Sequence, residues 1–171
     1  MKTVFTAAHE AGLPDGAISC ITIPTMEATQ ELMRHKYTSL ILATGGPGMV
    51  KAAYSSGTPA IGVGAGNGPA FIDQSANVED AIRRIVASKT FDNGTICASE
   101  QSIIIEKALE QRVVAALKNN GAYMLSEQES AQLAKILFRP GGALNPAIVG
   151  KPAAQVAKLA GITVPAQTRI L

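Results

Sequence analysis

Residues 39–54 of this 171-residue chain read SLILATGGPGMVKAAY, and this stretch decides the fold class. The run at 39–43 is nearly continuously apolar, which favours a parallel strand covered on both faces. A glycine-rich turn at 44–48 follows at once, and apolar residues then recur at helical spacing until Gly57. A strand, a tight turn and a helix in this order predict one β-α unit.

The same unit repeats on either side of that stretch. Apolar runs at 17–23 and 60–63 predict two more strands, and a helix is expected to begin after Thr25, which suits the N-cap position. A further short helix is expected over residues 3–11. Strands that alternate with helices predict a parallel sheet with right-handed crossovers.

The second half of the chain continues the alternation. Apolar patterns predict strands at 70–72, 102–105 and 147–149. Helices are expected over 78–89, 109–117 and 152–160, and a capping box at Ser126 opens another helix. The predicted class is therefore α/β throughout.

Composition excludes several functional classes. The chain is 47% hydrophobic with a net charge of +2, and its 15 lysine and arginine residues are scattered, so nucleic acid is not an expected partner. No apolar run reaches the roughly 18 residues of a membrane span, and the N-terminus has no signal-peptide pattern.

Two cysteines argue against a disulfide framework and for a reducing, cytoplasmic location. Cys20 lies inside an apolar run and is expected to be a buried small residue.

Two glycine-rich loops are candidate binding sites. Residues 44–48 lie between a strand and a helix N-terminus, where backbone N–H groups favour a phosphate; steric packing of a tight turn explains the same glycines equally well. Residues 62–69 leave an open backbone that a ligand could pass, or form a flexible connection between strands. This second loop contains no acidic residue or histidine that could act as a base.

Cys97 is the candidate nucleophile. It follows an Asn-Gly pair and precedes an apolar strand, a position where a thiolate could meet a substrate. The alternative is a buried cysteine that only packs. His9 and His35 are distant in sequence, so activation would come from helix dipoles, backbone N–H groups or the charge of a cofactor.

Three segments together, residues 43–54, 62–67 and 88–101, resemble the CoA-acylating branch of the aldehyde dehydrogenase superfamily. The chain is similar to acetaldehyde and propionaldehyde dehydrogenases and to the aldehyde half of bifunctional aldehyde-alcohol dehydrogenases. The resemblance implies that residues 1–72 are the C-terminal part of a Rossmann-like cofactor domain. Residues 73–171 would then be the N-terminal part of the catalytic domain.

The resemblance also implies a reaction. Cys97 would attack an aldehyde, a hydride would pass to NAD (NADP is not excluded), and coenzyme A would take the acyl group from the thioester. The backbone N–H of Cys97 would help to hold the oxyanion. The resemblance implies that the cofactor pyrophosphate contacts Thr44, Gly45, Gly46, Pro47 and Gly48. Gly62, Val63 and Gly64 would lie beside the nicotinamide. Ile96 and Ala98 would contact the acyl group. No metal is implied.

Gly62 bears on the product. Hydrolytic members of the superfamily carry a glutamate at this place and use it to activate water. A general base contributes about 10² to 10⁴ in rate, or roughly 3 to 5 kcal/mol of barrier. A thiol needs less help, because part of it is already thiolate near neutral pH. Glycine therefore favours acyl-CoA over the free acid.

The chain is much shorter than family catalytic chains, so it is expected to be a fragment that holds the nucleophile without a whole active site. Steady turnover of propionaldehyde with NAD and CoA would contradict that expectation. Two alternatives stay open: a hydrolytic aldehyde dehydrogenase, and an inactive nucleotide-binding or assembly module with Cys97 buried. For the full-length protein the resemblance implies a homo-oligomer and allows association with a bacterial microcompartment shell.

Overall fold

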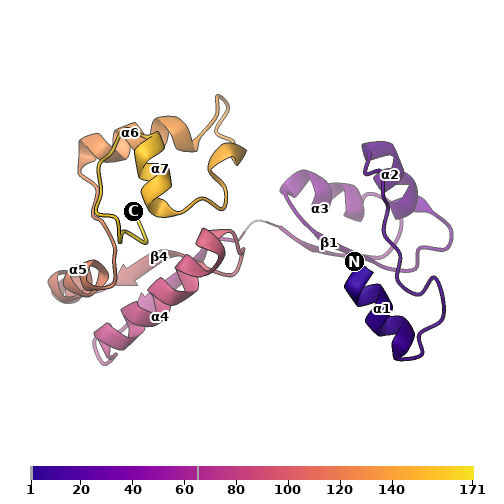
Figure 1. Ribbon diagram of the computed structural model, residues 1–171, viewed down its shortest axis with the longest axis horizontal. Helices are drawn as coiled ribbons and strands as arrows, with labels where there is room; N and C mark the ends of the chain where they lie inside the picture. The colour runs from indigo at the N-terminus through magenta and orange to yellow at the C-terminus, as the bar shows by residue number, and fades with distance from the viewer. Residues whose placement is uncertain (1, 65) are drawn as a thin grey trace. The chain divides into compact units, whose positions relative to one another are not determined.

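The computed structural model describes residues 2–64 and 66–171 and divides into two compact units, Met1–Ala65 and Gly66–Leu171 (Figure 1). Both units contain helices and parallel strand pairs, so the predicted α/β class is confirmed. None of the helices in the described part of the chain is long and apolar enough to cross a membrane.

The first unit contains the predicted β-α-β arrangement. Strands β1 (Ile41–Thr44) and β2 (Ala60–Val63) pair in parallel, and α3 (Pro47–Tyr54) connects them. Helices α1 (Lys2–Glu10) and α2 (Met26–Arg34) precede them. Thr25 is the N-cap of α2, as predicted, because its hydroxyl oxygen accepts a hydrogen bond of 3.0 Å from the backbone N–H of Ala28.

One face of the β1–β2 pair is covered. Met33, Ala43 and Ala53 form its small core, where α2 and α3 meet the strands. On the other face Leu42 is 73% exposed and Ile61 is 57% exposed. The prediction that both faces are covered is therefore wrong for the described residues, because the helices of this unit pack on one side only.

Residues 17–23 form no strand, which contradicts the prediction from their apolar pattern. β-Propensity requires a neighbouring strand to pair with, and the described residues supply none for this segment. Cys20 is consequently exposed, and the prediction that it is buried is also wrong.

The second unit begins with another parallel pair, β3 (Gly68–Ile72) and β4 (Glu100–Ile105), joined through α4 (Val78–Thr90) and a 3₁₀ turn, η1 (Phe91–Gly94). The elements after β4 are η2 (Lys107–Leu109), α5 (Glu110–Asn119), α6 (Glu127–Leu137), η3 (Pro146–Ile148) and α7 (Ala153–Leu159).

The strand expected at 147–149 is instead the 3₁₀ turn η3. Pro146 has no N–H to donate to a sheet, and the Asn145 side chain accepts a hydrogen bond of 3.1 Å from the N–H of Ala147. This cap competes with an extended conformation and wins at this site.

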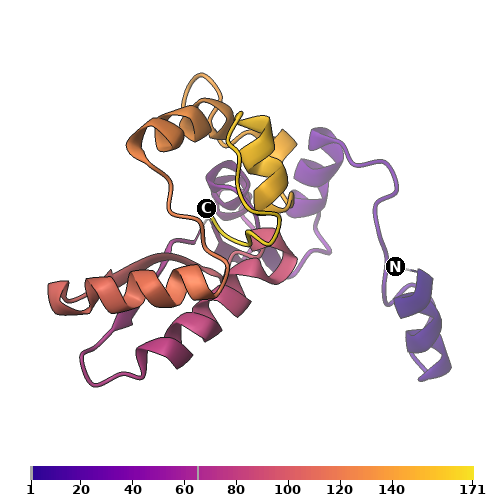
Figure 2. The ribbon, with the colours of Figure 1, turned by 60° about the vertical axis from the view of Figure 1, so that its left-hand side comes forward.

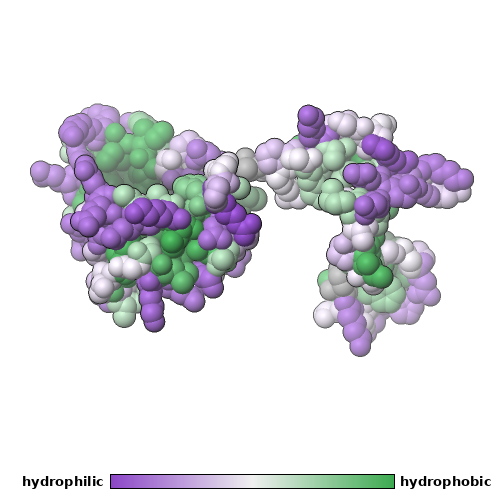
Figure 3. All heavy atoms as spheres, turned by 90° about the horizontal axis from the view of Figure 1, so that it is seen from above, coloured by the Kyte–Doolittle hydropathy of each residue, from purple (hydrophilic) through white to green (hydrophobic). Residues whose placement is uncertain are grey.

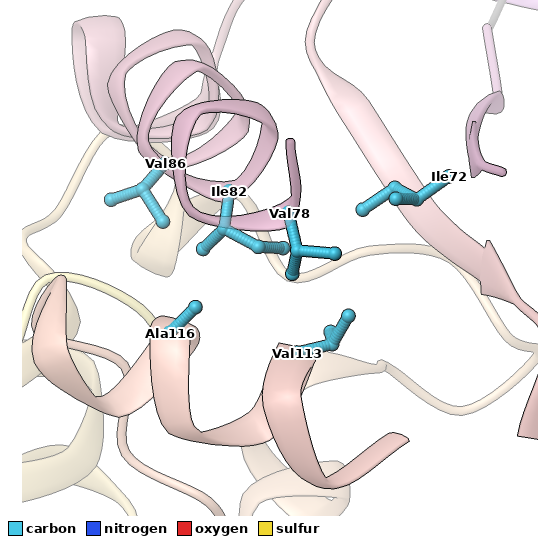
Figure 4. Packing of buried hydrophobic residues seen from close by; sticks show 6 residues of the cluster. All are labelled: Ile72, Val78, Ile82, Val86, Val113 and Ala116. Atoms are coloured by element: carbon cyan, nitrogen blue, oxygen red, sulfur yellow. The ribbon is translucent and has the colours of Figure 1, made fainter. Parts of the chain in front are cut away.

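Helix α4 supplies the main core of the second unit. Val78, Ile82 and Val86 lie on one face of α4, are fully buried, and face α5, which carries Val113 and Ala116 (Figure 4). In both Figure 1 and Figure 2, α4 and α5 lie side by side. The same cluster includes Ile72, Ala116 and the inward side chains of β4.

β3 and β4 also have one exposed face. Phe71 and Ile104, which are register partners, are 64% and 50% exposed. Apolar residues therefore lie on the surface of each unit, as the hydrophobic colouring in Figure 3 shows. The division between the units falls at 65/66, seven residues before the predicted domain boundary, because β3 pairs with β4 and so belongs to the second unit.

Substituting Ile82 with alanine is expected to lower the free energy of unfolding by about 2 to 5 kcal/mol, because the removed methyl groups leave a cavity in the core. Ile104→Ala is the matched control: its side chain is half exposed, so we expect about 1 kcal/mol or less. Urea unfolding followed by circular dichroism measures both, and equal losses would contradict the assigned core.

The N-terminus of α6 predicts a pH dependence. Hydrogen bonds from the backbone N–H and the hydroxyl of Ser126, and then from the Tyr123 hydroxyl, hold the pKa of Glu129 below its ordinary value. A carboxyl whose pKa is lowered on folding stabilises the fold above its unfolded-state pKa and loses this contribution as pH falls through the folded-state pKa.

Glu129→Gln should therefore destabilise the chain near pH 7 and become equal to the unsubstituted chain in acid. Urea midpoints measured from pH 7 down to pH 3 test this. A stability gap that stays constant over this range would show that the carboxylate charge has no part in the cap.

Candidate functional site

Cys97 lies in the turn between η1 and β4, and its thiol is exposed. The flanking residues Ile96 and Ala98 are exposed as well. Ser99 then enters the protein interior, 1% exposed, and its hydroxyl donates a hydrogen bond of 3.1 Å to the carbonyl of Ile96. The alternative in which Cys97 is a buried packing residue is contradicted by this exposure.

The turn before Cys97 has a left-handed backbone. Asp92 and Asn93 have φ values of 52° and 49°, and Gly94 follows at 74°. Residues other than glycine enter this region at a cost of about 1 kcal/mol or more, and asparagine and aspartate do so most readily. The Asp-Asn-Gly sequence therefore allows a reversal that most other residues would resist.

A long-range hydrogen bond anchors this strained turn. The Asn93 side-chain amide donates to the carbonyl of Gly150 over 2.9 Å, 57 residues away in sequence. Arg169 donates to the Thr90 hydroxyl at the end of α4 over 2.6 Å, and that hydroxyl donates to the carbonyl of Val86. The turn that precedes Cys97 is thus fixed at its start to the C-terminal part of the chain.

Gly66 approaches Cys97 from the second glycine-rich loop. A Cβ atom at this position would lie 2.9 Å from the Cys97 carbonyl oxygen, so only glycine fits without a shift of backbone. Among residues 2–64 and 66–171, the backbone N–H of Cys97 has no hydrogen-bond acceptor. It is therefore available to a ligand.

The predicted pyrophosphate loop lies at the carboxyl end of β1. Thr44 ends the strand, Gly46 is the N-cap of α3 and Pro47 occupies its first turn. Neither Gly46 nor Gly48 has a neighbour within 4 Å of a Cβ placed there. The first N–H groups of a helix have no internal acceptor, and this open N-terminus is suited to an anion.

Gly45 has a different environment. Its N–H donates to the Val63 carbonyl over 3.1 Å, and a Cβ atom here would meet the Met49 sulfur at 2.7 Å. Because the Met49 side chain is flexible and its sulfur could move aside, this contact is a weak packing reason for the glycine, and the open helix N-terminus lies beside it.

Parallel pairing brings the two loops that were predicted to contact a nucleotide to the same edge of the sheet. Ala43 lies opposite Gly62 and Thr44 lies opposite Val63, so both loops leave the same edge of the β1–β2 pair. Val63 and Gly64 are exposed. Gly62 packs against α3, where its N–H donates to the Tyr54 hydroxyl over 2.9 Å.

A second group, Ile96, Cys97 and Ala98, lies in the other unit. A cleft of about 390 Å³ in that unit is lined by Asn93, Thr95 and Gly150, and the three predicted residues are not among those that line it. No cluster of histidine, cysteine, aspartate or glutamate in the described residues could hold a metal ion.

Sequence reasoning missed the groups that hold these loops. Tyr54 and Val50 recur at i and i+4 on α3, which predicts a shared face but not the backbone that this face contacts. The roles of Asn93 and Arg169 depend on contacts over 57 and 79 residues, and no local signal carries them.

The model of the aldehyde dehydrogenase family matches residues 1–133, and the chain belongs to this family. The chain is 49% identical over 168 residues to the bifunctional aldehyde-alcohol dehydrogenase AdhE of Escherichia coli (strain K12). That match covers 98% of this chain and 19% of the relative. These matches confirm the family that was predicted from residues 43–54, 62–67 and 88–101.

Two solved structures share the fold. The crystal structure of a probable aldehyde dehydrogenase from Listeria monocytogenes EGD-e superposes with a TM-score of 0.95 at 58% identity, covering 99% of this chain and 38% of the other. Rhodopseudomonas palustris propionaldehyde dehydrogenase, solved with bound CoA and an acylated cysteine, superposes with a TM-score of 0.88 at 34% identity. That match covers 96% of this chain and 38% of the other. This chain spans about a fifth of the first relative and less than two fifths of the two solved ones.

The strained turn yields a matched pair of substitutions. Asp92→Gly and Asn93→Gly both relieve a positive φ, but only the second removes the hydrogen bond to Gly150. We expect Asn93→Gly to be the less stable by about 0.5 to 1 kcal/mol. Chemical unfolding of the two variants side by side measures the difference; equal stabilities would show that the Asn93 amide does not anchor the turn.

Proposed function

We propose that this chain carries the nucleophile and the cofactor loops of an acylating aldehyde dehydrogenase, which oxidises a small aldehyde to its acyl-CoA. The observation that carries the proposal is the exposed Cys97 thiol at the end of a fixed, strained turn. The names of relatives support the acylating branch: one is a sulfoacetaldehyde dehydrogenase (acylating), 40% identical over 167 residues.

Cys97 would act first as a nucleophile. Its sulfur bonds to the aldehyde carbon, and the carbonyl oxygen takes up the negative charge as a thiohemiacetal oxyanion. The N–H of Cys97, which has no acceptor among residues 2–64 and 66–171, supports a role in holding this oxygen, since a donor fixed before the reaction needs no reorganisation. Exposed Ile96 and Ala98 lie on either side and would contact the acyl chain.

The loops at the β1–β2 edge would bind the nicotinamide cofactor, which accepts the hydride when bound. The residues present fit a dinucleotide: the N-terminus of α3 is open at Gly46 and Gly48, and no carboxylate stands in the 44–48 loop to repel phosphate. In this assignment Thr44 to Gly48 contact the pyrophosphate, and Gly62 to Gly64 lie at the nicotinamide. NAD and NADP both remain in the proposal; an engineered glycolyl-CoA reductase with the same fold was solved with NADP⁺.

The acyl acceptor would be a thiol. The thioester on Cys97 needs a general base for rapid hydrolysis, and Gly62 supplies none. The thiolate form of coenzyme A, part of which is already present near neutral pH, attacks the acyl carbon; the carbon–sulfur bond to Cys97 breaks, and Cys97 leaves as a thiolate.

One solved relative supports a proposal about location, and the homo-oligomeric state is what the family resemblance implies. One solved relative is a propionaldehyde dehydrogenase from the fucose utilisation microcompartment of Clostridium phytofermentans. A homo-oligomeric full-length protein, in the cytoplasm or inside such a compartment, completes the proposal.

Alkylation by iodoacetamide tests whether Cys97 is activated. Cys20 and Cys97 are both exposed, so access alone gives similar rates and Cys20 serves as the internal control. We expect Cys97 to react about 10-fold faster or more, because an activated cysteine has a larger thiolate fraction. Peptide mass spectrometry over time measures each rate, and equal rates would contradict activation.

Acyl transfer from p-nitrophenyl acetate tests the rest of the proposal without a nicotinamide. We expect one equivalent of p-nitrophenolate as Cys97 is acetylated, release of the acetyl group as acetyl-CoA when CoA is added, and loss of both in Cys97→Ser. Acetate formed equally fast without CoA would favour the hydrolytic alternative, and no acetylation would favour an inactive nucleotide-binding or assembly module in which the exposed Cys97 is not a nucleophile.

A further inference from the structure

The backbone of Gly62 lies against two side chains of α3. A Cβ atom on Gly62 would be 2.6 Å from Cγ1 of Val50 and 2.9 Å from Cε2 of Tyr54. Real Cβ atoms do not approach heavy atoms this closely, so any side chain here requires α3 to change. Gly64, two residues further along the same segment, has no neighbour within 4 Å of a Cβ atom.

The two contacts differ in how easily they yield. Val50 is β-branched and lies within a helix, where its χ1 angle has one strongly preferred value, so its methyl group cannot swing aside cheaply. Tyr54 is 58% exposed and could rotate, but its hydroxyl accepts the 2.9 Å hydrogen bond from the N–H of Gly62. Moving the ring would remove that acceptor.

We propose that Val50 and Tyr54 are specificity-determining residues, because they exclude every side chain, and with it a general base, from position 62. The inference rests on the proposed function, in which Cys97 carries the acyl group and position 62 is the place where hydrolytic members of the superfamily carry the glutamate that activates water. With a carboxylate there, that group would take a proton from water while the water oxygen bonded to the acyl carbon. The carbon–sulfur bond would break and Cys97 would leave as a thiolate.

The choice between water and a thiol is therefore encoded on α3 as well as at residue 62. A substitution at Gly62 alone inserts a carboxylate into occupied space and displaces the strand end. Val50 and Tyr54 must first be replaced by smaller residues, since only then can a longer side chain at position 62 extend past α3. Three positions, rather than one, separate the acylating from the hydrolytic arrangement in this chain.

The first stage of the test measures packing and needs no activity. Gly62→Ala should lower the melting temperature by roughly 5 °C or more, whereas the matched control Gly64→Ala should change it little. Adding Val50→Ala to Gly62→Ala should cost much less than the sum of the two single effects. Additive losses would overturn the inference, whatever Cys97 does.

The second stage measures which acceptor takes the acyl group. After acetylation of Cys97 by p-nitrophenyl acetate, release of acetate and of acetyl-CoA is followed in Gly62→Glu with native α3 and with Val50→Ala and Tyr54→Ala added. We expect hydrolysis to rise about 100-fold only in the combined variant, in the range of general-base catalysis. A loss of fold alone would slow both routes together and leave their ratio unchanged.

Two results of the second stage overturn the inference. One is an equal rise in hydrolysis with native α3, and the other is an unchanged ratio in a combined variant that stays folded. Neither affects the proposed function, which fails separately if the unsubstituted chain is not acetylated at Cys97 or passes no acetyl group to CoA.

Discussion

The burial of one face of α4 is the constraint on which the Cys97 turn depends. Val78, Ile82 and Val86 fix this helix against β3, β4 and α5, and the helix ends where the reversal at residues 92–94 begins. Burial of each such side chain stabilises the fold by about 1.5 to 3 kcal/mol, so the three together contribute several kcal/mol. This is enough to hold two non-glycine residues in left-handed conformations, which cost about 1 to 3 kcal/mol each. The exposed thiol is thus positioned by a core that it does not touch.

Among its described residues, the first unit has no large core that positions a side chain for chemistry. Its core is small, and the function proposed for it depends on backbone rather than side chains: an open helix N-terminus after β1 and a glycine at the end of β2. Helix α3 connects the two, because its first residues, Pro47 and Gly48, belong to the predicted phosphate loop while Val50 and Tyr54 contact Gly62. Changes on this helix would therefore alter cofactor binding and the acyl acceptor together.

Local pattern predicted most of the elements, because helices with caps, such as α2 at Thr25 and α6 at Ser126, carry their signals within a few residues. Local pattern failed to predict the structure where a strand needs a partner strand or where a side-chain cap favours a turn. Residues 17–23 have the composition of a strand but no partner strand in the described part of the chain. Residues 147–149 were predicted to be a strand, but the Asn145 cap stabilises a 3₁₀ turn there. Cys97 and the glycine loops were visible in sequence, whereas Asn93, Val50 and Tyr54 were not, since their contacts join distant residues.

The Asn93 side chain that anchors the turn is followed directly by a glycine, Gly94. Asparagine followed by glycine is the pair most prone to deamidation, because the next backbone nitrogen meets little steric hindrance. Here the amide is the donor that reaches the Gly150 carbonyl. A carboxylate in its place only accepts hydrogen bonds, so two oxygens would face each other where a donor and an acceptor had met. Deamidation of Asn93 would therefore remove the hydrogen bond that anchors the turn before Cys97 while leaving the Cys97 thiol intact.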